Sequence, residues 1–210
     1  MRRRHIGWAA GAAAAALVAA GAITYAVAED TGGPRTRTPG AESADAGFAR
    51  DMAVHHQQAV EMSYIVRDRT KNEEVRRLAY DIAQTQANQR GMLLGWLDLW
   101  GLPKVSAEPP MTWMGMGRMA SGEDGALMPG MATNTELKKL GSLSGERAEV
   151  FYLQLMTDHH KGGVHMAEGC VARCAVGVEK RLARGMVEAQ RSEIELMTGM
   201  LRERGAGPRS

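Results

Sequence analysis

Apolar and polar positions recur with a helical period along most of this chain. From about residue 46 to 69, residues three and four places apart share one face, while Gln57, Gln58 and Glu61 point away from it. The same period returns in three further segments, over about residues 73–100, 146–173 and 178–204. The pattern therefore predicts four long helices.

The four helices form two pairs, because only a short turn at Lys71 and Asn72 separates the first two and a similar gap separates the last two. A capping-box pattern of Thr133 and Glu136 predicts one more, short helix that runs to about Leu140. Two hairpins that each carry one apolar face can bury those faces against each other. We therefore expect an all-α fold, a four-helix bundle.

The two hairpins are near copies of each other. In each copy a Met precedes a His-His pair by three residues, and a second Met follows the pair by six. These motif residues are Met52, His55, His56 and Met62 in the first copy, and Met156, His159, His160 and Met166 in the second. A shift of 104 places aligns residues 52–101 with residues 156–205 without a gap, and thirteen of the fifty pairs are identical. The chain thus contains an internal duplication of one helical hairpin.

These patterns divide the chain into segments. Residues 1–28 begin with three arginines and continue with an uncharged run of 23 residues, which predicts a signal peptide or a membrane anchor. The segment that follows, residues 29–45, is rich in Gly and Pro and predicts a flexible linker. The bundle domain then takes residues 46–205, as hairpin repeat 1 (46–101), a Met-rich connection (102–145) and hairpin repeat 2 (146–205).

Composition supports an exported helical protein. Aromatic residues make up only 5% of the chain and Met occurs fifteen times, which suits helices better than sheet. The chain has 26 basic and 24 acidic residues, and three of the basic ones lie in the N-terminal segment, so the exported part is close to neutral. This charge excludes a nucleic-acid footprint. We expect a protein outside the cytoplasm, secreted or anchored to the cell membrane by its N-terminal helix.

Cys170 and Cys174 are the only cysteines of the chain. In an exported protein two cysteines usually form one disulfide. A spacing of four residues puts both on one helix face, where a bridge is strained unless the helix ends between them. We expect a disulfide, with free thiols or soft-metal ligands as the alternatives.

The paired histidines are the strongest candidates for chemistry. Imidazole binds Zn, Cu, Fe or Ni, whereas the thioether sulfur of Met selects Cu(I) and, by the same softness, Ag(I). Inward Met residues at helical spacing are more often core than ligands. Four inward His placed identically in two copies are harder to explain as core, because burying them unpaired costs free energy. We therefore predict a copper site in which His and Met from both copies are ligands.

The Met-rich connection is a second candidate. It places six Met within 21 residues, including Met114, Met116, Met128 and Met131, in a stretch interrupted by Gly and Pro. The alternative is a flexible segment whose Met pack loosely on the bundle. We expect weak Cu(I) capture here. His165 corresponds to Glu61 of the first copy and is expected on the surface.

The doubled His-His motif, together with Met128-Pro129-Gly130-Met131, resembles the family called domain of unknown function 305 over about residues 48–203. The resemblance implies a ferritin-like four-helix bundle that is usually exported, and some members are implicated in copper binding. It implies as signature residues His55, His56, Met62, His159, His160 and Met166. The family's pattern for the last helix is matched by Gln190, Glu193, Ile194 and Met197. The first copy departs from the pattern, with Gln89 and Arg90 where Glu and Ile are expected.

Three functions compete. The first is an exported copper buffer or chaperone. The second is a di-iron oxidase, which needs Glu-x-x-His pairs, and the chain contains none. The third is a structural or protein-interaction bundle in which the histidines bond one another. We favour the first and expect no enzyme activity. The expected partners are a metal ion and, if the N-terminal segment is retained, the membrane. A homodimer is left open.

Overall fold

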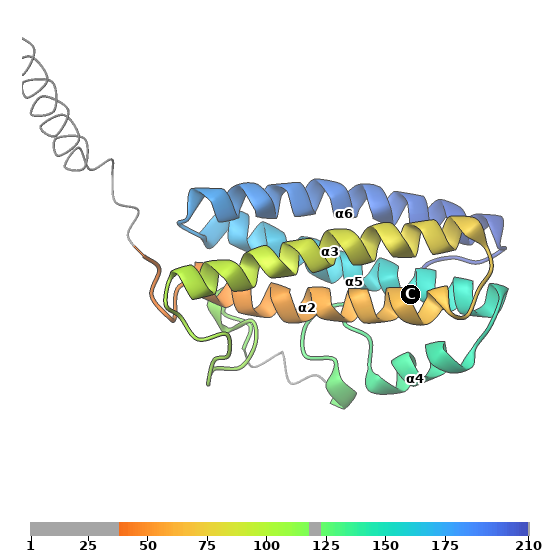
Figure 1. Cartoon of the computed structure of the whole chain (residues 1–210), viewed down its shortest axis with the longest axis horizontal. Helices are drawn as coiled ribbons and strands as arrows, with labels where there is room; N and C mark the ends of the chain where they lie inside the picture. Colours follow the sequence, from red (N-terminus) through yellow and green to blue (C-terminus); the bar gives the residue numbers. More distant parts are fainter. Residues whose placement is uncertain (1–37, 118–122, 210) are drawn as a thin grey trace, which may run out of the picture. The chain divides into compact units, whose positions relative to one another are not determined.

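The computed structural model describes residues 38–117 and 123–209, and its helices account for most of them. The four long helices are α2 (Ala44–Arg67), α3 (Glu73–Leu99), α5 (Glu146–Arg173) and α6 (Gly177–Glu203). They run side by side, and the short α4 (Asn134–Ser142) lies against α2 and α5 (Figure 1). The 3-10 turns η1 (Thr112–Met114) and η2 (Glu123–Gly125) lie in the connection. None of the described residues forms a β-strand, which confirms the all-α prediction.

Side-chain caps define where three of the helices begin. The hydroxyl of Ser43 accepts the backbone N–H of Ala46, so α2 begins two residues earlier than the sequence pattern indicated. Asn72 caps α3 by accepting two backbone N–H groups. The predicted capping box of Thr133 and Glu136 is present at the start of α4.

The second helices of the two hairpins end in the same way. Gly101 follows α3 and Gly205 follows α6, and both have a positive φ that a residue with a side chain rarely adopts. One residue further on, the backbone N–H of Leu102 donates to Leu97, as that of Ala206 donates to Leu201. The two C-terminal motifs are 104 residues apart, so the duplication extends to the backbone geometry.

Two buried apolar clusters make up the core. One contains Met62, Met156 and Met197, and the other contains Met52 and Met166. Each cluster draws residues from both hairpins, which pack on each other through α2 and α5. Apolar packing in both clusters thus holds the two copies together.

The Met-rich connection is anchored to the bundle. The Asp51 carboxylate accepts the backbone N–H of Met111 at 2.7 Å and the indole N–H of Trp113 at 2.9 Å. Further along, the Gln58 amide exchanges two hydrogen bonds with the backbone of Ala132. Met111 is fully buried. Most of this connection is therefore fixed in place rather than loosely packed.

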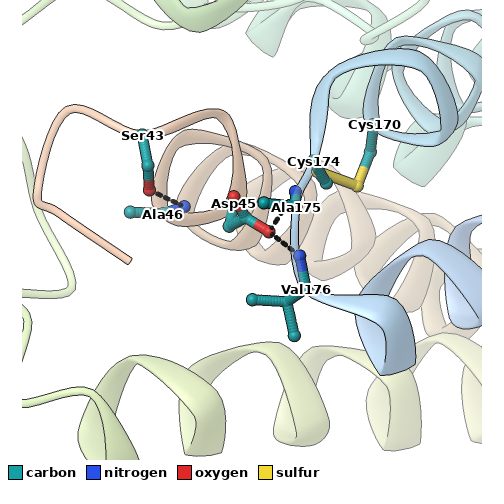
Figure 2. The surroundings of a disulfide bond; sticks show 7 residues. All are labelled: Ser43, Asp45, Ala46, Cys170, Cys174, Ala175 and Val176. Carbon is teal, nitrogen blue, oxygen red and sulfur yellow. Dashed lines mark hydrogen bonds between the residues drawn. A yellow bond between two sulfur atoms is a disulfide. The ribbon is translucent and has the colours of Figure 1, made fainter. Parts of the chain in front are cut away.

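A disulfide closes the end of α5. It joins Cys170 to Cys174, and α5 ends at Arg173, between the two. This confirms the disulfide prediction and supplies the helix end that the short spacing requires. Figure 2 shows the Asp45 carboxylate just beyond it, accepting the backbone N–H groups of the two residues that follow Cys174.

The predicted N-terminal helix, residues 1–28, and most of the predicted linker lie outside the described residues. Among the helices that the structure describes, none has the length and apolarity needed to cross a membrane.

The contact between α5 and the Met128–Met131 segment leads to a first prediction. A Cβ on Gly162 would collide with the Pro129 carbonyl and the Cα of Gly130. Gly162→Ala is therefore expected to lower the free energy of unfolding by about 1–3 kcal/mol, measured by chemical denaturation. Gly185→Ala, on α6 with open space around the new methyl group, is the matched control and should raise it by up to about 1 kcal/mol. Equal effects of the two variants would contradict this packing.

Candidate metal centre

A layer of four histidines crosses the middle of the structure. His55 and His56 come from α2, and His159 and His160 from α5, and all four side chains are 0% exposed. The rings of His55 and His159 lie face to face, with centroids 3.8 Å apart. Along α2 the histidines lie between Met52 of one apolar cluster and Met62 of the other, and along α5 between Met156 and Met166, so the layer lies between the two clusters.

Each histidine donates one hydrogen bond to an acceptor that cannot donate in return. His55 Nε2 lies 3.2 Å from the carbonyl oxygen of Pro129, and His159 Nε2 lies 2.9 Å from that of His55. His56 Nε2 lies 2.9 Å from Oε1 of Gln89, and His160 Nε2 lies 2.7 Å from a carboxylate oxygen of Glu193. These oxygens require the proton on Nε2 in all four rings.

The other ring nitrogen, Nδ1, lacks such a partner. The Nδ1 atoms of His55, His56, His159 and His160 are buried and have no hydrogen-bond partner within the described structure. Buried polar atoms normally find one. An imidazole whose N–H is held by an oxygen and whose other nitrogen is unpartnered is oriented as a metal ligand.

Two buried glutamines complete the polar level. Gln86 of α3 and Gln190 of α6 are equivalent in the duplication, and each has an unpartnered Oε1. Gly163 of α5 makes room for Gln190, since a Cβ there would collide with the amide. Both glutamines are buried, with 3% of each exposed.

Burial keeps three histidines of the layer uncharged. It lowers the pKa of His55 to about 4 and that of His56 to about 3, and it holds the pKa of His159 well below its ordinary value. Neighbouring histidines lower these pKa values further, because their charges would repel. At neutral pH these three rings are neutral, which is the form that binds metals.

The motif methionines lie on both sides of the layer. Met62 and Met156 are fully buried in one cluster, together with Met197, and Met52 and Met166 are fully buried in the other. Each pair takes one Met from each copy, because the copies pack against each other in opposite directions. The layer therefore has thioether sulfurs in the core on either side of it.

The nitrogen atoms of the layer do not converge on one point. In the described part of the chain, three ligand atoms from His, Cys, Asp and Glu come within 4.8 Å of one another only at Cys170, Cys174 and Glu179. An ion in the layer would thus take one or two of these nitrogens.

The methionines of the connection are placed differently. Met128 is buried, whereas Met114, Met116 and Met131 are partly buried and pack against the cluster of Met52 and Met166. The structure places none of them in the layer. Met116 lies at the surface end of this group, with its sulfur 3.4 Å from Nε2 of His165. His165 is exposed, as expected, but its contact with Met116 was not foreseen.

The sequence singled out Gln89 and Glu193 but did not predict that each bonds a histidine of the layer. Gln89 and Glu193 occupy equivalent positions and bond equivalent histidines, so the departure of the first copy from the family pattern replaces a carboxylate by an amide. The alignment of the two copies at a shift of 104 residues already pairs Gln89 with Glu193. Both side chains are partly exposed, so they connect the buried layer with solvent.

The lowered histidine pKa values predict acid instability. The unfolded chain binds protons at a pKa near 6.5, whereas folded His55 does so only near 4, so the free energy of unfolding should fall as the pH falls from about 6.5 to about 4. Removing His55 and His159 by substitution to Leu should reduce this slope by about 1.4 kcal/mol per pH unit for each histidine. Denaturant unfolding across this pH range measures the slope. Val54→Leu, at an exposed position of α2 without a titratable group, is the control with an unchanged slope, and a double variant with the wild-type slope would contradict the account.

The sequence and the fold of this chain are similar to those of known proteins. The sequence model of the domain of unknown function 305 (DUF305) matches residues 45–201. The crystal structure of a DUF305 protein from Streptomyces coelicolor, described as secreted, is 74% identical with a TM-score of 0.76, and the match covers 81% of this chain and 99% of that one. A DUF305 fragment from Deinococcus radiodurans is 32% identical with a TM-score of 0.63, over 76% and 96% of the two chains.

More distant matches share the fold. CopM in its Cu(I)-bound form is 18% identical with a TM-score of 0.57, over 76% of this chain and 96% of that one. CopM in its Cu(II)-bound form is 22% identical with a TM-score of 0.58, over 77% and 97%. A search of the curated proteins found no match. Because the family model spans most of the residues, including both His-His motifs, this chain belongs to the DUF305 family.

Proposed function

We propose that this protein binds copper outside the cytoplasm and that the histidine layer, with the methionines on either side, is its principal site. The observation that carries the proposal is the set of four unpartnered Nδ1 atoms. Each is the free nitrogen of a ring whose N–H is held by an oxygen, and all four are buried. A metal ion is the ligand that such nitrogens bind best.

Copper is favoured over other metals by the ligand types. The layer offers neutral imidazoles and the core beside it offers thioethers, a combination that suits Cu(I) and Ag(I) and that Zn²⁺ or Fe²⁺ does not prefer. The fold is shared with CopM, which has been crystallised with Cu(I), Cu(II) and Ag. The role proposed here is binding, as a buffer or chaperone, rather than catalysis.

We also propose a four-helix bundle architecture and export of the chain. The two duplicated hairpins form a ferritin-like four-helix bundle, and the N-terminal apolar segment directs the chain out of the cytoplasm, where it is either cleaved or remains as an anchor. The close relative described as secreted supports export. A homodimer remains a proposal.

The exposed end of the connection suits capture of the ion. Met116 and His165 present a sulfur and an imidazole nitrogen 3.4 Å apart at the surface, with Met114 packed on α5 beside them at Gly169. A sulfur and a nitrogen at the surface would bind Cu(I) weakly. We propose that this pair receives the ion, and that the partly exposed Gln89 and Glu193 border a route into the layer.

A metal titration of the full-length protein tests the principal site. In competition with a chelator of known Cu(I) affinity, replacing all four layer histidines by Leu is expected to weaken Cu(I) and Ag(I) binding by about 100-fold or more. Met116→Leu with His165→Leu should slow loading and leave the affinity of the layer unchanged. Circular dichroism of each variant establishes that it is folded.

Two outcomes of this titration would sink the proposal. One is wild-type affinity in a folded four-histidine variant, and the other is no Cu(I) binding by the wild-type protein. Either would favour the alternative, a bundle that acts in structure or in protein interaction, where the histidines serve packing alone.

The difference between the copies offers a second prediction. A carboxylate acceptor makes an imidazole a better ligand than an amide does. Glu193→Gln, which copies the Gln89 arrangement onto His160, should weaken Cu(I) binding about 10-fold, and Gln89→Glu should strengthen it by a similar factor. The same competition assay measures both, with Glu195→Gln on exposed α6 surface as the matched control. Equal affinities of the two variants would show that these partners do not tune the layer.

A further inference from the structure

The end of the structure that carries the disulfide holds a second group of possible ligands. Cys170 and Cys174 are 0% and 3% exposed, and Glu179 in the first turn of α6 is 0% exposed. The two sulfurs and a carboxylate oxygen of Glu179 all lie within 4.8 Å of one another. The histidine layer contributes no residue to this group, which makes it a separate site.

No basic or neutral donor bonds either carboxyl oxygen of Glu179 in the described structure, and its polar neighbour is the carboxyl group of Asp45. Burial and this second acidic group raise the pKa of Glu179 to about 9. A buried carboxylate without a partner is costly, and such groups are usually paired or bound to a cation. One of its carboxyl oxygens lies within 4.8 Å of both sulfur atoms, so the unsatisfied group belongs to the ligand cluster itself.

The first copy of the hairpin shows which residues occupy the three equivalent positions in the absence of such a ligand cluster. The equivalents of Cys170, Cys174 and Glu179 in the first copy are Val66, Thr70 and Val75. Both valines are fully buried in an apolar cluster. In the first copy the place is thus filled by two valines and by a Thr70 hydroxyl that bonds Glu149, and the second copy has two sulfurs and a carboxyl group there instead.

The two ends of the structure also differ in whether a basic side chain pairs with their carboxyl groups. At the other end the equivalent of Asp45 is Glu149, whose carboxylate forms an ion pair with Arg204 at 2.8 Å. Asp45 uses one oxygen to accept the backbone N–H groups of Ala175 and Val176 (Figure 2). Within residues 38–117 and 123–209, no basic side chain forms an ion pair with Asp45 or Glu179. This end therefore has two carboxyl groups and lacks a cation.

We propose that Cys170, Cys174 and Glu179 form a metal site that binds Zn²⁺ when the disulfide is reduced. Zn²⁺ binds thiolate sulfur and carboxylate oxygen together, and a divalent ion balances most of the charge of two thiolates and one carboxylate. Cu(I) suits the set less well, since a carboxylate is a hard ligand and a single positive charge would leave more buried negative charge. The disulfide form has no thiolates and does not bind the ion.

The redox step is a thiol–disulfide exchange with a dithiol. The S–S bond of Cys170 and Cys174 breaks, the dithiol becomes a disulfide, and its two hydrogens pass to the two protein sulfurs. Zn²⁺ then replaces the two thiol protons and the proton of the Glu179 carboxyl group. The bound ion in turn protects the thiols from oxidation, because their lone pairs are shared with the metal.

Zinc titration of the full-length protein in both redox states tests the proposal. The protein is reduced with a dithiol until a thiol assay counts two thiols, and the dithiol is removed without oxygen. Against a chromophoric chelator, the reduced protein should bind one Zn²⁺ more than the oxidised protein. Cys170→Ser with Cys174→Ser should remove this ion. Glu179→Gln should weaken its binding at least 10-fold, and Glu188→Gln on exposed α6 surface should leave it unchanged.

Co²⁺ in place of Zn²⁺ adds a spectroscopic readout, with thiolate-to-cobalt charge-transfer absorption expected in the reduced protein only. A variant without the four layer histidines should retain the additional ion, which separates this site from the copper proposal. Equal Zn²⁺ binding in the two redox states would overturn the proposal. So would wild-type affinity in Glu179→Gln, since the thiols would then bind the ion without the carboxylate.

Discussion

The structure depends on how four buried imidazoles are hydrogen-bonded. Each uses its Nε2 proton on an oxygen, from a loop carbonyl, a helix carbonyl, an amide or a carboxylate, and each leaves Nδ1 without a partner. An apolar layer would be cheaper to bury at this level, and the two clusters on either side show that the fold supports one. The free-energy cost of burying this polar layer is explained if a ligand binds the four unpartnered Nδ1 atoms. The Met128–Met131 segment serves the same layer, since the Pro129 carbonyl holds His55.

The duplication explains much of the arrangement. Packing two copies in opposite directions brings His55 against His159 and groups the motif methionines in pairs on both sides of them. At each end of the structure, a carboxylate from one hairpin also bonds the turn of the other hairpin. Glu149 bonds Thr70 in the first turn, and Asp45 bonds the backbone of the second. Where the copies differ, at Gln89 and Glu193 or at Val75 and Glu179, the difference is chemical rather than architectural.

Much of the fold could be predicted from the sequence, because periodicity, caps and the repeat are local signals. The starts of α3 and α5 and the capping box at Thr133 agree with the structure, and inward placement of the four histidines followed from their helical phase. The tautomers could not be predicted, since they depend on partners such as Pro129, 74 residues from His55. Nor could the buried Glu179, because its local pattern is that of an acidic residue in a first helical turn, which is ordinarily exposed.

The measurement that tests the central claim most directly is the nitrogen NMR spectrum of the histidine rings, recorded before and after addition of Cu(I). Before addition, Nε2 should carry the proton and Nδ1 should have the chemical shift of a free lone pair in all four layer histidines. Cu(I) should then move the Nδ1 resonances of His55 or His159, or both, while the Nε2 protons stay in place. Protonated Nδ1 atoms in the free protein, or Nδ1 resonances that saturating Cu(I) leaves unchanged, would contradict the account.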